Sequence, residues 1–420
     1  MSRFQPSAGG LAALGVLAFC FVMNALARGA GETYAVFLLP IGDETGWHRG
    51  DLTSVYSLYM AANGLASPFV GLAFDRFGPR ILYVFGLVLL GSGFMLAGSM
   101  ASLWEMYLSV GLMGGLGIAS LGMIPASALI SRWFDRRLAT AMAVASTGLG
   151  TGTLVLVPLA QVLIDVEGWR TAYLWLGAII TAVAVPVALL PWSRITSGAV
   201  ADRPLTERIP AVRPGLLRVI CGRPFWALFF VFFLTAVAIY SVSLQSVAYL
   251  VDQGYSPLEA ASAFGFTGVL SIVGMLVTGI AADRYGNRVT ATVSYACSFV
   301  GVVALFAMQA APSFALVVVF VIFFGVSMGA RGPIVSTIAA TLFAGRGLGT
   351  IYGTITTGQG LGAAAGSWIA GFLHDLTGGY DAGFLMSSVF IGLAVILFWT
   401  VPELVARRSR PAQPESKALP

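Results

Sequence analysis

The sequence predicts an all-α polytopic membrane protein, with twelve transmembrane helices in two pseudo-symmetric halves of six. Its 420 residues are 58% hydrophobic and only 10% charged, whereas soluble proteins average about 25% charged residues. Apolar runs long enough to cross about 30 Å of hydrocarbon as helices follow one another almost to the C-terminus. Because glycine and proline are scattered through long runs without the alternation of barrel strands, the spans are helices.

Turn residues and charges separate the apolar runs, so that the spans can be placed in order. The first six are expected near Leu11–Ile41, Leu52–Phe74, Pro79–Ser99, Trp104–Ile130, Leu138–Ile164 and Trp169–Leu190. The second six are expected near Phe225–Val251, Leu258–Ala282, Val289–Gln309, Ser313–Phe343, Leu348–Leu373 and Ala382–Val401. An arginine- and proline-rich stretch between them is typical of a solvated linker. We therefore expect an N-terminal half at 1–190, a cytoplasmic linker at 191–224, a C-terminal half at 225–401 and a cytoplasmic tail at 402–420.

An internal repeat relates the two halves. The turn Asp-Arg-Phe-Gly-Pro-Arg at 75–80 recurs as Asp-Arg-Tyr-Gly-Asn-Arg at 283–288, an offset of 208 residues (283 − 75 = 208). Gly150 and Gly358 keep the same offset. Parallel repeats around an axis normal to the membrane are typical of secondary transporters, which bind substrate near the midplane between the repeats.

The loop charges predict orientation. Lys and Arg gather in the loops on the side of both termini, and only Arg49 and Arg170 lie in loops on the other side. The positive-inside rule then predicts that both termini lie on the cytoplasmic side of a plasma membrane, which we expect to be a bacterial inner membrane.

The duplicated turns carry charges at helix ends, and we expect them to gate conformation rather than only to set topology. These gating residues are Asp75, Arg76, Arg80, Asp283, Arg284 and Arg288.

Three charged residues lie in the interior of predicted spans, away from the span ends, where an arginine costs roughly 2.5–3.5 kcal/mol on insertion scales. Arg28 and Glu32 are four residues apart on one helix face. Either they only neutralise each other, or Arg28 attracts a substrate carboxylate while Glu32 carries a proton. Arg331 lies in the tenth span without an acidic residue in the same span. It is either a structural tie across the halves or a second bidentate ligand for the anion.

Polar and aromatic side chains in four spans form a second set of candidates. Each of them alone also fits the alternative role of hydrogen-bonding between helices. We expect the substrate-binding set to comprise Arg28, Arg331, Tyr34, Tyr59, Asn63, Tyr240, Gln245 and Gln359, with Glu32 in proton coupling. Tyr240 ranks first in the second set because it lies 208 residues after Glu32.

Enzyme chemistry finds little support in the sequence. His48 and His374 are the only histidines, the three cysteines lie apart, and the metal-ligand spacings and the phosphate-binding P-loop are missing. We therefore expect neither an enzyme nor an ATP-driven pump, and no metal or cofactor. The expected partners are a small anion, protons and the lipid bilayer. We expect no binding of nucleic acid, and we expect the protein to be a monomer.

The Gly71–Arg80 turn and its copy at Gly279–Arg288 resemble the signature of the major facilitator superfamily. Three further stretches are similar to bacterial members of the monocarboxylate and oxalate:formate transporter group: Gly46–Arg49, Gly148–Pro158, and Gly360–Gly371 followed by Asp375–Tyr380. This resemblance implies a rocker-switch transporter of carboxylate anions, coupled to protons or to a counter-anion.

The sequence departs from that pattern at one place. Eukaryotic monocarboxylate transporters carry an aspartate and an arginine in span eight, whereas Ser271–Gly279 is uncharged here. We expect Arg331 to take the place of that arginine. The predicted function is secondary active transport of small carboxylate anions by alternating access, as proton symport. An anion exchanger of the same fold, a drug/proton antiporter and a non-transporting membrane sensor are the alternatives.

Overall fold

The computed structural model describes residues 8–134, 138–197, 222–342 and 348–401, and every regular element in these ranges is a helix. The N-terminal half contains α1 (Ala8–Glu32), α2 (Tyr34–Thr45), α3 (Arg49–Gly98), α4 (Leu103–Met106), the π-helix η1 (Tyr107–Gly114), α5 (Gly115–Leu121), α6 (Met123–Ile130), α7 (Leu138–Leu189) and α8 (Trp192–Ser197). The C-terminal half contains α10 (Arg223–Asp252), α11 (Pro257–Tyr285), α12 (Asn287–Ala310), α13 (Phe314–Leu342), α14 (Leu348–Thr377) and α15 (Asp381–Thr400).

Nine described segments are long and apolar enough to cross a membrane. Two of them, α3 and the segment Thr140–Leu189 of α7, are 50 residues long, and a single crossing needs only about 20. Each of these long helices bends at a glycine with positive φ, Gly78 and Gly168, both at 79°. Helix α14, with 30 residues, is also long enough to span. The described helices are therefore consistent with the twelve predicted spans.

The backbone repeats between the halves as the sequence does. Positive-φ glycines end the first and second spans at Gly46 and Gly78, and their counterparts are Gly254 and Gly286. Both pairs are 208 residues apart (254 − 46 and 286 − 78). Glycine adopts this left-handed conformation without the steric cost of a Cβ atom. The same tight turns therefore reverse the chain at matching places in each half.

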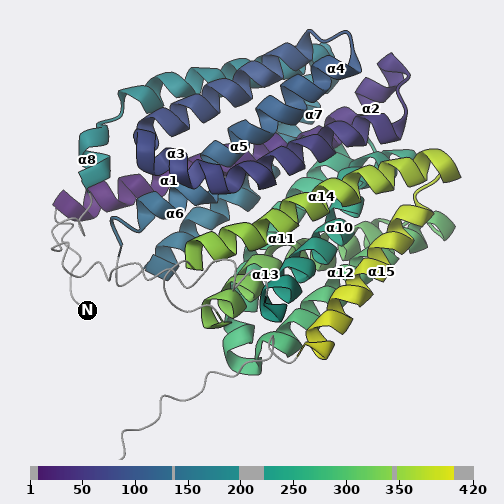
Figure 1. Ribbon diagram of the computed structural model, residues 1–420. Coiled ribbons are helices and arrows are strands. Elements are labelled where there is room, and N and C mark those ends of the chain that lie inside the picture. The colour runs from purple at the N-terminus through teal and green to yellow at the C-terminus, as the bar shows by residue number, and fades with distance from the viewer. Residues whose placement is uncertain (1–7, 135–137, 198–221, 343–347, 402–420) are drawn as a thin grey trace, which may run out of the picture.

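The two halves lie side by side as separate bundles. Figure 1 shows the purple-to-teal helices α1–α8 packed together, next to the green and yellow helices α10–α15. Helix α14 packs against α3, and α11 packs against α7, so these two pairs form the boundary between the halves. We call the end of the molecule where α1 begins and α15 ends the terminal face, and the other end the opposite face.

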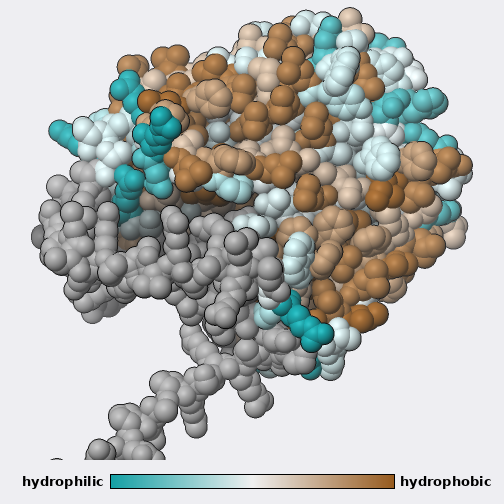
Figure 2. Space-filling model, viewed as in Figure 1, coloured by the Kyte–Doolittle hydropathy of each residue, from teal (hydrophilic) through white to brown (hydrophobic). Residues whose placement is uncertain are grey.

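The outer surface suits a lipid environment. Figure 2 shows apolar side chains over most of the coloured surface, with hydrophilic ones gathered toward the ends of the bundles. Large apolar side chains such as Phe69, Trp104 and Leu189 are 68–78% exposed. Such exposure is costly in water but not in a bilayer, where the neighbouring lipid tails are equally apolar. The chain is thus a multi-pass membrane protein.

The predicted first and fourth spans are less regular than expected. The first span is interrupted directly after Glu32. There the Val36 amide donates a 3.0 Å hydrogen bond to the Thr33 carbonyl, and the Thr33 hydroxyl donates one of 2.7 Å to the Ala30 carbonyl. Such local side-chain bonds compete with regular helix bonding. The fourth span is divided into α4, η1, α5 and α6, with extended torsions at Gly122 between the last two.

Helix α8 occupies the start of the expected linker. Its Trp192 is buried, with the Phe19 and Tyr83 rings 5.5 and 6.2 Å away between centroids. The expected linker from 198 to 221 and the tail from 402 to 420 lie outside the described residues.

Glycines let the two halves touch backbone to backbone near mid-helix. A Cβ atom on Gly360 of α14 would lie 2.6 Å from the Gly64 Cα of α3. A Cβ on Gly150 of α7 would lie 2.1 Å from the Gly268 carbonyl oxygen of α11. Small residues at helix crossings permit this close approach in membranes. Each side of the boundary therefore has one crossing where no side chain larger than hydrogen fits without movement.

We expect Gly360→Ala to lower the free energy of unfolding by about 1–3 kcal/mol, because the added methyl group overpacks the crossing with α3. The measurement is thermal unfolding of the purified protein. Gly392→Ala is the matched control, since a Cβ on Gly392 of α15 meets nothing within 4 Å. An equal thermal midpoint for the two variants would show that the crossing is not tightly packed.

Candidate functional site

The charged residues of the first span meet the other half near mid-helix. Arg28 Nη2 lies 2.6 Å from Glu32 Oε1, one helical turn further along α1. Arg28 Nη1 also donates a 2.8 Å hydrogen bond to the hydroxyl of Tyr240 on α10. One arginine is therefore held by an acid of its own half and a phenol of the other.

Arg331 approaches the same tyrosine from α13. Its guanidinium carbon is 5.8 Å from the centre of the Tyr240 ring, and that of Arg28 is 5.7 Å away. The residue is only 4% exposed, and its Nε and Nη1 atoms have no hydrogen-bond partner in the structure. An unsatisfied buried guanidinium is expensive unless an anion pairs with it. Arg331 is therefore the charged group of the cluster whose hydrogen bonding the described residues leave incomplete.

A row of stacked tyrosines adjoins the charged cluster. The Tyr34 and Tyr56 rings are 5.6 Å apart, those of Tyr56 and Tyr59 are 5.4 Å apart, and Tyr56 lies 6.5 Å from Tyr240. The Tyr34 hydroxyl donates a 2.8 Å hydrogen bond to the Leu52 carbonyl. The buried Tyr59 hydroxyl has no hydrogen-bond partner among the described residues. The row gives the cluster an apolar wall with one free polar group.

The remaining predicted polar residues are less closely tied to the cluster. Gln245 is 2% exposed, and both atoms of its side-chain amide are buried without a partner. It follows Tyr240 by five residues on α10. Asn63 on α3 and Gln359 on α14 are half-buried, and no contact with the charged cluster is recorded for either. The structure thus brings together Arg28, Glu32, Tyr240 and Arg331 with the tyrosine row, and leaves Asn63 and Gln359 apart.

Access to the cluster is uneven. The Arg28 side chain is 28% exposed, whereas the Glu32 side chain is 4% exposed. Four hydrogen bonds join the two halves at this cluster and at the opposite face. The boundary is therefore joined at mid-helix and at the opposite face.

The first predicted gating turn is solvent-accessible. Asp75, Arg76 and Arg80 are exposed, and no ion pair joins them to another described residue. In the second turn Arg284 is exposed, and Arg288 donates 3.3 Å hydrogen bonds to the Phe398 and Trp399 carbonyls at the end of α15. The Asp283 side chain lies outside what the structure describes.

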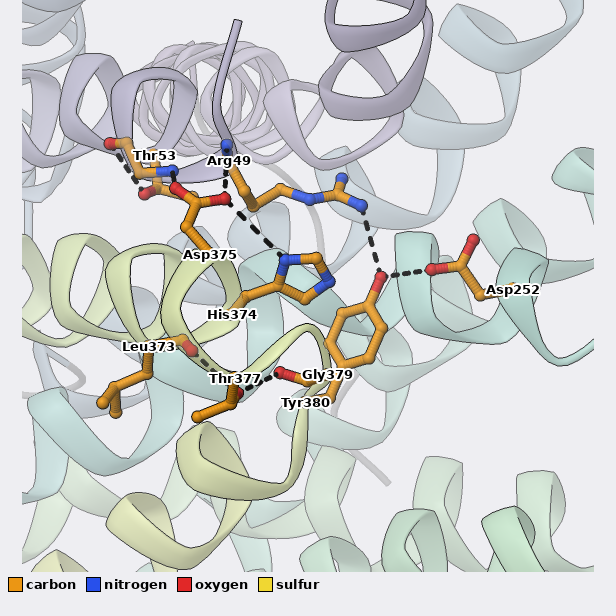
Figure 3. Close-up of polar contacts among 10 residues, drawn as sticks. Arg49, Thr53, Asp252, Leu373, His374, Asp375, Thr377, Gly379 and Tyr380 are labelled. Carbon is orange, nitrogen blue, oxygen red and sulfur yellow. Dashed lines mark hydrogen bonds and ion pairs between the residues drawn. The ribbon is translucent and has the colours of Figure 1, made fainter.

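Figure 3 shows contacts between the halves at the opposite face that sequence reasoning did not identify. The Asp375 carboxylate near the end of α14 accepts hydrogen bonds from the Arg49 and Gly50 amides at 2.9 and 2.6 Å. Arg49 Nη2 donates to the Tyr380 hydroxyl at 3.3 Å, and that hydroxyl donates to Asp252. Gly46–Arg49 and Asp375–Tyr380 stood out in the sequence as family-like stretches, but spacing alone does not show that they meet.

No group of three or more histidine, cysteine or acidic residues lies close enough to hold a metal ion within the described parts of the chain. The cluster of Arg28, Glu32, Tyr240 and Arg331 itself offers two guanidinium groups, one carboxylate and a phenol.

Comparison with known proteins supports this picture. The family model of the Major Facilitator Superfamily matches residues 17–330 and 276–420. Monocarboxylate transporter 13 of Rattus norvegicus is 28% identical over 390 residues, which cover 93% of this chain and 88% of the relative. Monocarboxylate transporter 11 of Homo sapiens is 27% identical over 386 residues, or 90% of this chain and 80% of the relative.

A solved structure shares the fold. It is the crystal structure of a bacterial homolog to the human lysosomal transporter Spinster, in an inward-facing and occupied conformation. The TM-score is 0.74 at 16% sequence identity, and the match covers 94% of this chain and 99% of that one. With a family model that matches nearly the whole sequence, the chain belongs to the major facilitator superfamily and is a membrane transporter, not an enzyme.

Proposed function

We propose that this transporter carries small organic carboxylate anions by alternating access. The observation that supports the proposal best is Arg331, a 4% exposed guanidinium with two unsatisfied nitrogens. Its guanidinium and that of Arg28 lie 5.8 and 5.7 Å from the centre of the same Tyr240 ring, and one arginine comes from each half. A carboxylate between them can take bidentate hydrogen bonds from planar guanidinium groups. The names of the monocarboxylate transporter relatives point to the same class of substrate.

The charges of the cluster favour an anion over a cation. Arg28 and Arg331 contribute two positive charges and Glu32 one negative charge, so that the ionised cluster carries a net charge of +1. A cationic drug would add to an uncompensated positive charge in a low-dielectric site. A single carboxylate brings the sum to zero. We therefore prefer an anion carrier to a drug/proton antiporter.

Glu32 is the proposed proton carrier. Arg28 is its ion-pair partner at 2.6 Å. When a substrate carboxylate takes over Arg28, Glu32 is left buried without that partner, and a proton neutralises it. Substrate and proton then bind together, which is the basis of symport. Exchange of one anion for another needs no such proton and is the second mechanism for the same site.

The orientation of the chain follows from its charges. We propose that the terminal face lies in the cytoplasm, a placement that the excess of Lys and Arg in its loops supports through the positive-inside rule. In this orientation the hydrogen bonds of Asp375 and Arg49 across the boundary lie on the outer side of the membrane. The duplicated charged turns lie on the cytoplasmic side, where Asp75 and Asp283 would make contacts in the other state of the cycle.

We expect proteoliposomes containing the protein to take up labelled monocarboxylates faster when a proton gradient is imposed. Arg331→Lys keeps the charge but loses the planar fork, and we expect uptake to fall at least about tenfold. Glu32→Gln should retain anion binding but lose the stimulation by the gradient. Uptake that still responds to the gradient in Glu32→Gln would leave anion transport intact and remove Glu32 as the proton carrier.

The same site predicts opposite effects of two substitutions on stability. Arg331→Met removes an unsatisfied buried charge, and we expect the free energy of unfolding to rise by about 1 kcal/mol or more. Arg28→Met leaves Glu32 buried without its partner, and we expect a loss of about 3 kcal/mol. Thermal unfolding without substrate is the measurement. A lower midpoint for Arg331→Met would mean that Arg331 is a structural tie between helices and not a ligand.

A further inference from the structure

The start of α3 has no cap from its own half of the protein. The side chain of the N-cap residue, His48, makes no capping hydrogen bond. The amides of Arg49 and Gly50, at the first turn, have no carbonyl partner within a helix. Both bond instead to the two carboxylate oxygens of Asp375, which belongs to the other half. A helix start carries partial positive charge, so a carboxylate is well suited to this place.

The contact depends on two glycines. A Cβ atom on Gly50 would lie 2.9 Å from Asp375 Oδ2. A Cβ on Gly371, one helical turn before Asp375, would lie 2.0 Å from the Thr53 hydroxyl of α3. Only hydrogen at both positions lets α14 come close enough for the carboxylate to reach the amides. The capping contact therefore requires glycine at positions 50 and 371 of this boundary.

A second contact uses a clamp that is present in both halves. In the N-terminal half, the Trp169 indole donates to Glu44 at 2.6 Å. In the C-terminal half, Tyr380 donates to Asp252, which lies 208 residues after Glu44. Each clamp fastens the start of the last span to the end of the first within its own half.

The two clamps differ in what they can accept. An indole N–H is only a donor, whereas a phenol oxygen donates and accepts at once. Tyr380 therefore keeps its bond to Asp252 and also receives Arg49 from the other half. Burial raises the pKa of Tyr380, against the lowering effect of Arg49 and with a further rise from the bond to Asp252, so the phenol stays protonated. His374 Nδ1 lies 4.0 Å from Asp375 Oδ1 and completes the group.

We propose that Asp375 is a latch between the halves. By capping α3 it stabilises the state that is closed at the opposite face, and the contact between Arg49 and Tyr380 assists it. When the halves part there, the freed amides lie at a helix end that water can reach, so the contact can break and re-form in each cycle. The latch concerns the motion of the halves and does not depend on which substrate is carried.

The test measures how often the opposite face opens. Thr53→Cys places a thiol at a position that is 0% exposed, on α3 against Gly371 of α14. A small charged thiol reagent reaches it only when the halves part, so its rate of reaction reports the open population. Peptide mass spectrometry on the detergent-purified full chain assigns each modified cysteine, so the native cysteines can remain.

Asp375→Asn in this background keeps the shape of the side chain and removes its charge. We expect the introduced thiol to react about five- to tenfold faster, because charge-assisted hydrogen bonds are stronger than neutral ones. Tyr380→Phe keeps the ring and loses the hydroxyl, and we expect an acceleration of about two- to threefold. Asp381→Asn is the matched control: its carboxylate lies at the same face but bonds to Gln309 of its own half.

Cys20, which is 0% exposed in α1, reports general unfolding in the same samples. If Asp375 is a latch, Asp375→Asn leaves the reaction rate of Cys20 unchanged and raises the reaction rate of the introduced thiol. Two results would overturn the proposal. One is a rate for Asp375→Asn within twofold of that for Asp381→Asn. The other is an equal acceleration of Cys20, which would show loss of stability instead of opening.

Discussion

The hydrogen bond from Arg28 to Tyr240 is the interaction around which the two halves are arranged. It joins residues 212 positions apart at 2.8 Å and brings Arg28, Glu32 and Arg331 into one cluster. Charges in a low-dielectric interior are tolerated only when they are paired or when they serve a ligand. Here two of the three are paired, and the third is held against the same tyrosine ring. The imbalance leaves one positive charge for which the described residues supply no acidic partner.

The contacts between the halves differ in kind from mid-helix to the opposite face. At mid-helix, glycine crossings at Gly64 and Gly360 and at Gly150 and Gly268 hold backbones together with no room for a side chain. Beyond them, Asp375 and Arg49 join the opposite face through hydrogen bonds that water can replace. Rigid contacts thus lie where a rocking motion needs a pivot, and exchangeable ones lie where it needs an opening.

The repeat is most informative where its two copies differ. Trp169 and Tyr380 take the same place in their halves, each bonded to the acid at the end of the first span of its own half. Only the phenol has an oxygen that can also accept Arg49. A single change of ring chemistry therefore turns a clamp within one half into a contact between halves. The charged cluster shows the same asymmetry, since Glu32 has Tyr240, not an acid, 208 residues later.

The sequence by itself determined the class of protein, the order of the spans, the repeat and the identity of the buried charges. It could do so because a bilayer requires each span to pair its backbone hydrogen-bonding groups within one long apolar helix. The hydropathy and charge of a short stretch of sequence are therefore enough to recognise a span. Only the tertiary structure decided which charges meet: that Arg28 binds both Glu32 and Tyr240, that Arg331 stays unsatisfied, and that Asp375 caps α3. The i, i+4 spacing of Arg28 and Glu32 already allowed their pairing, but the contacts of Arg28 with Tyr240 and of Asp375 with α3 join residues of different spans. Such contacts depend on how helices pack, which no local spacing encodes. The break after Glu32 and the π-helix Tyr107–Gly114 have the same origin, since small backbone shifts follow from packing rather than from apolar content.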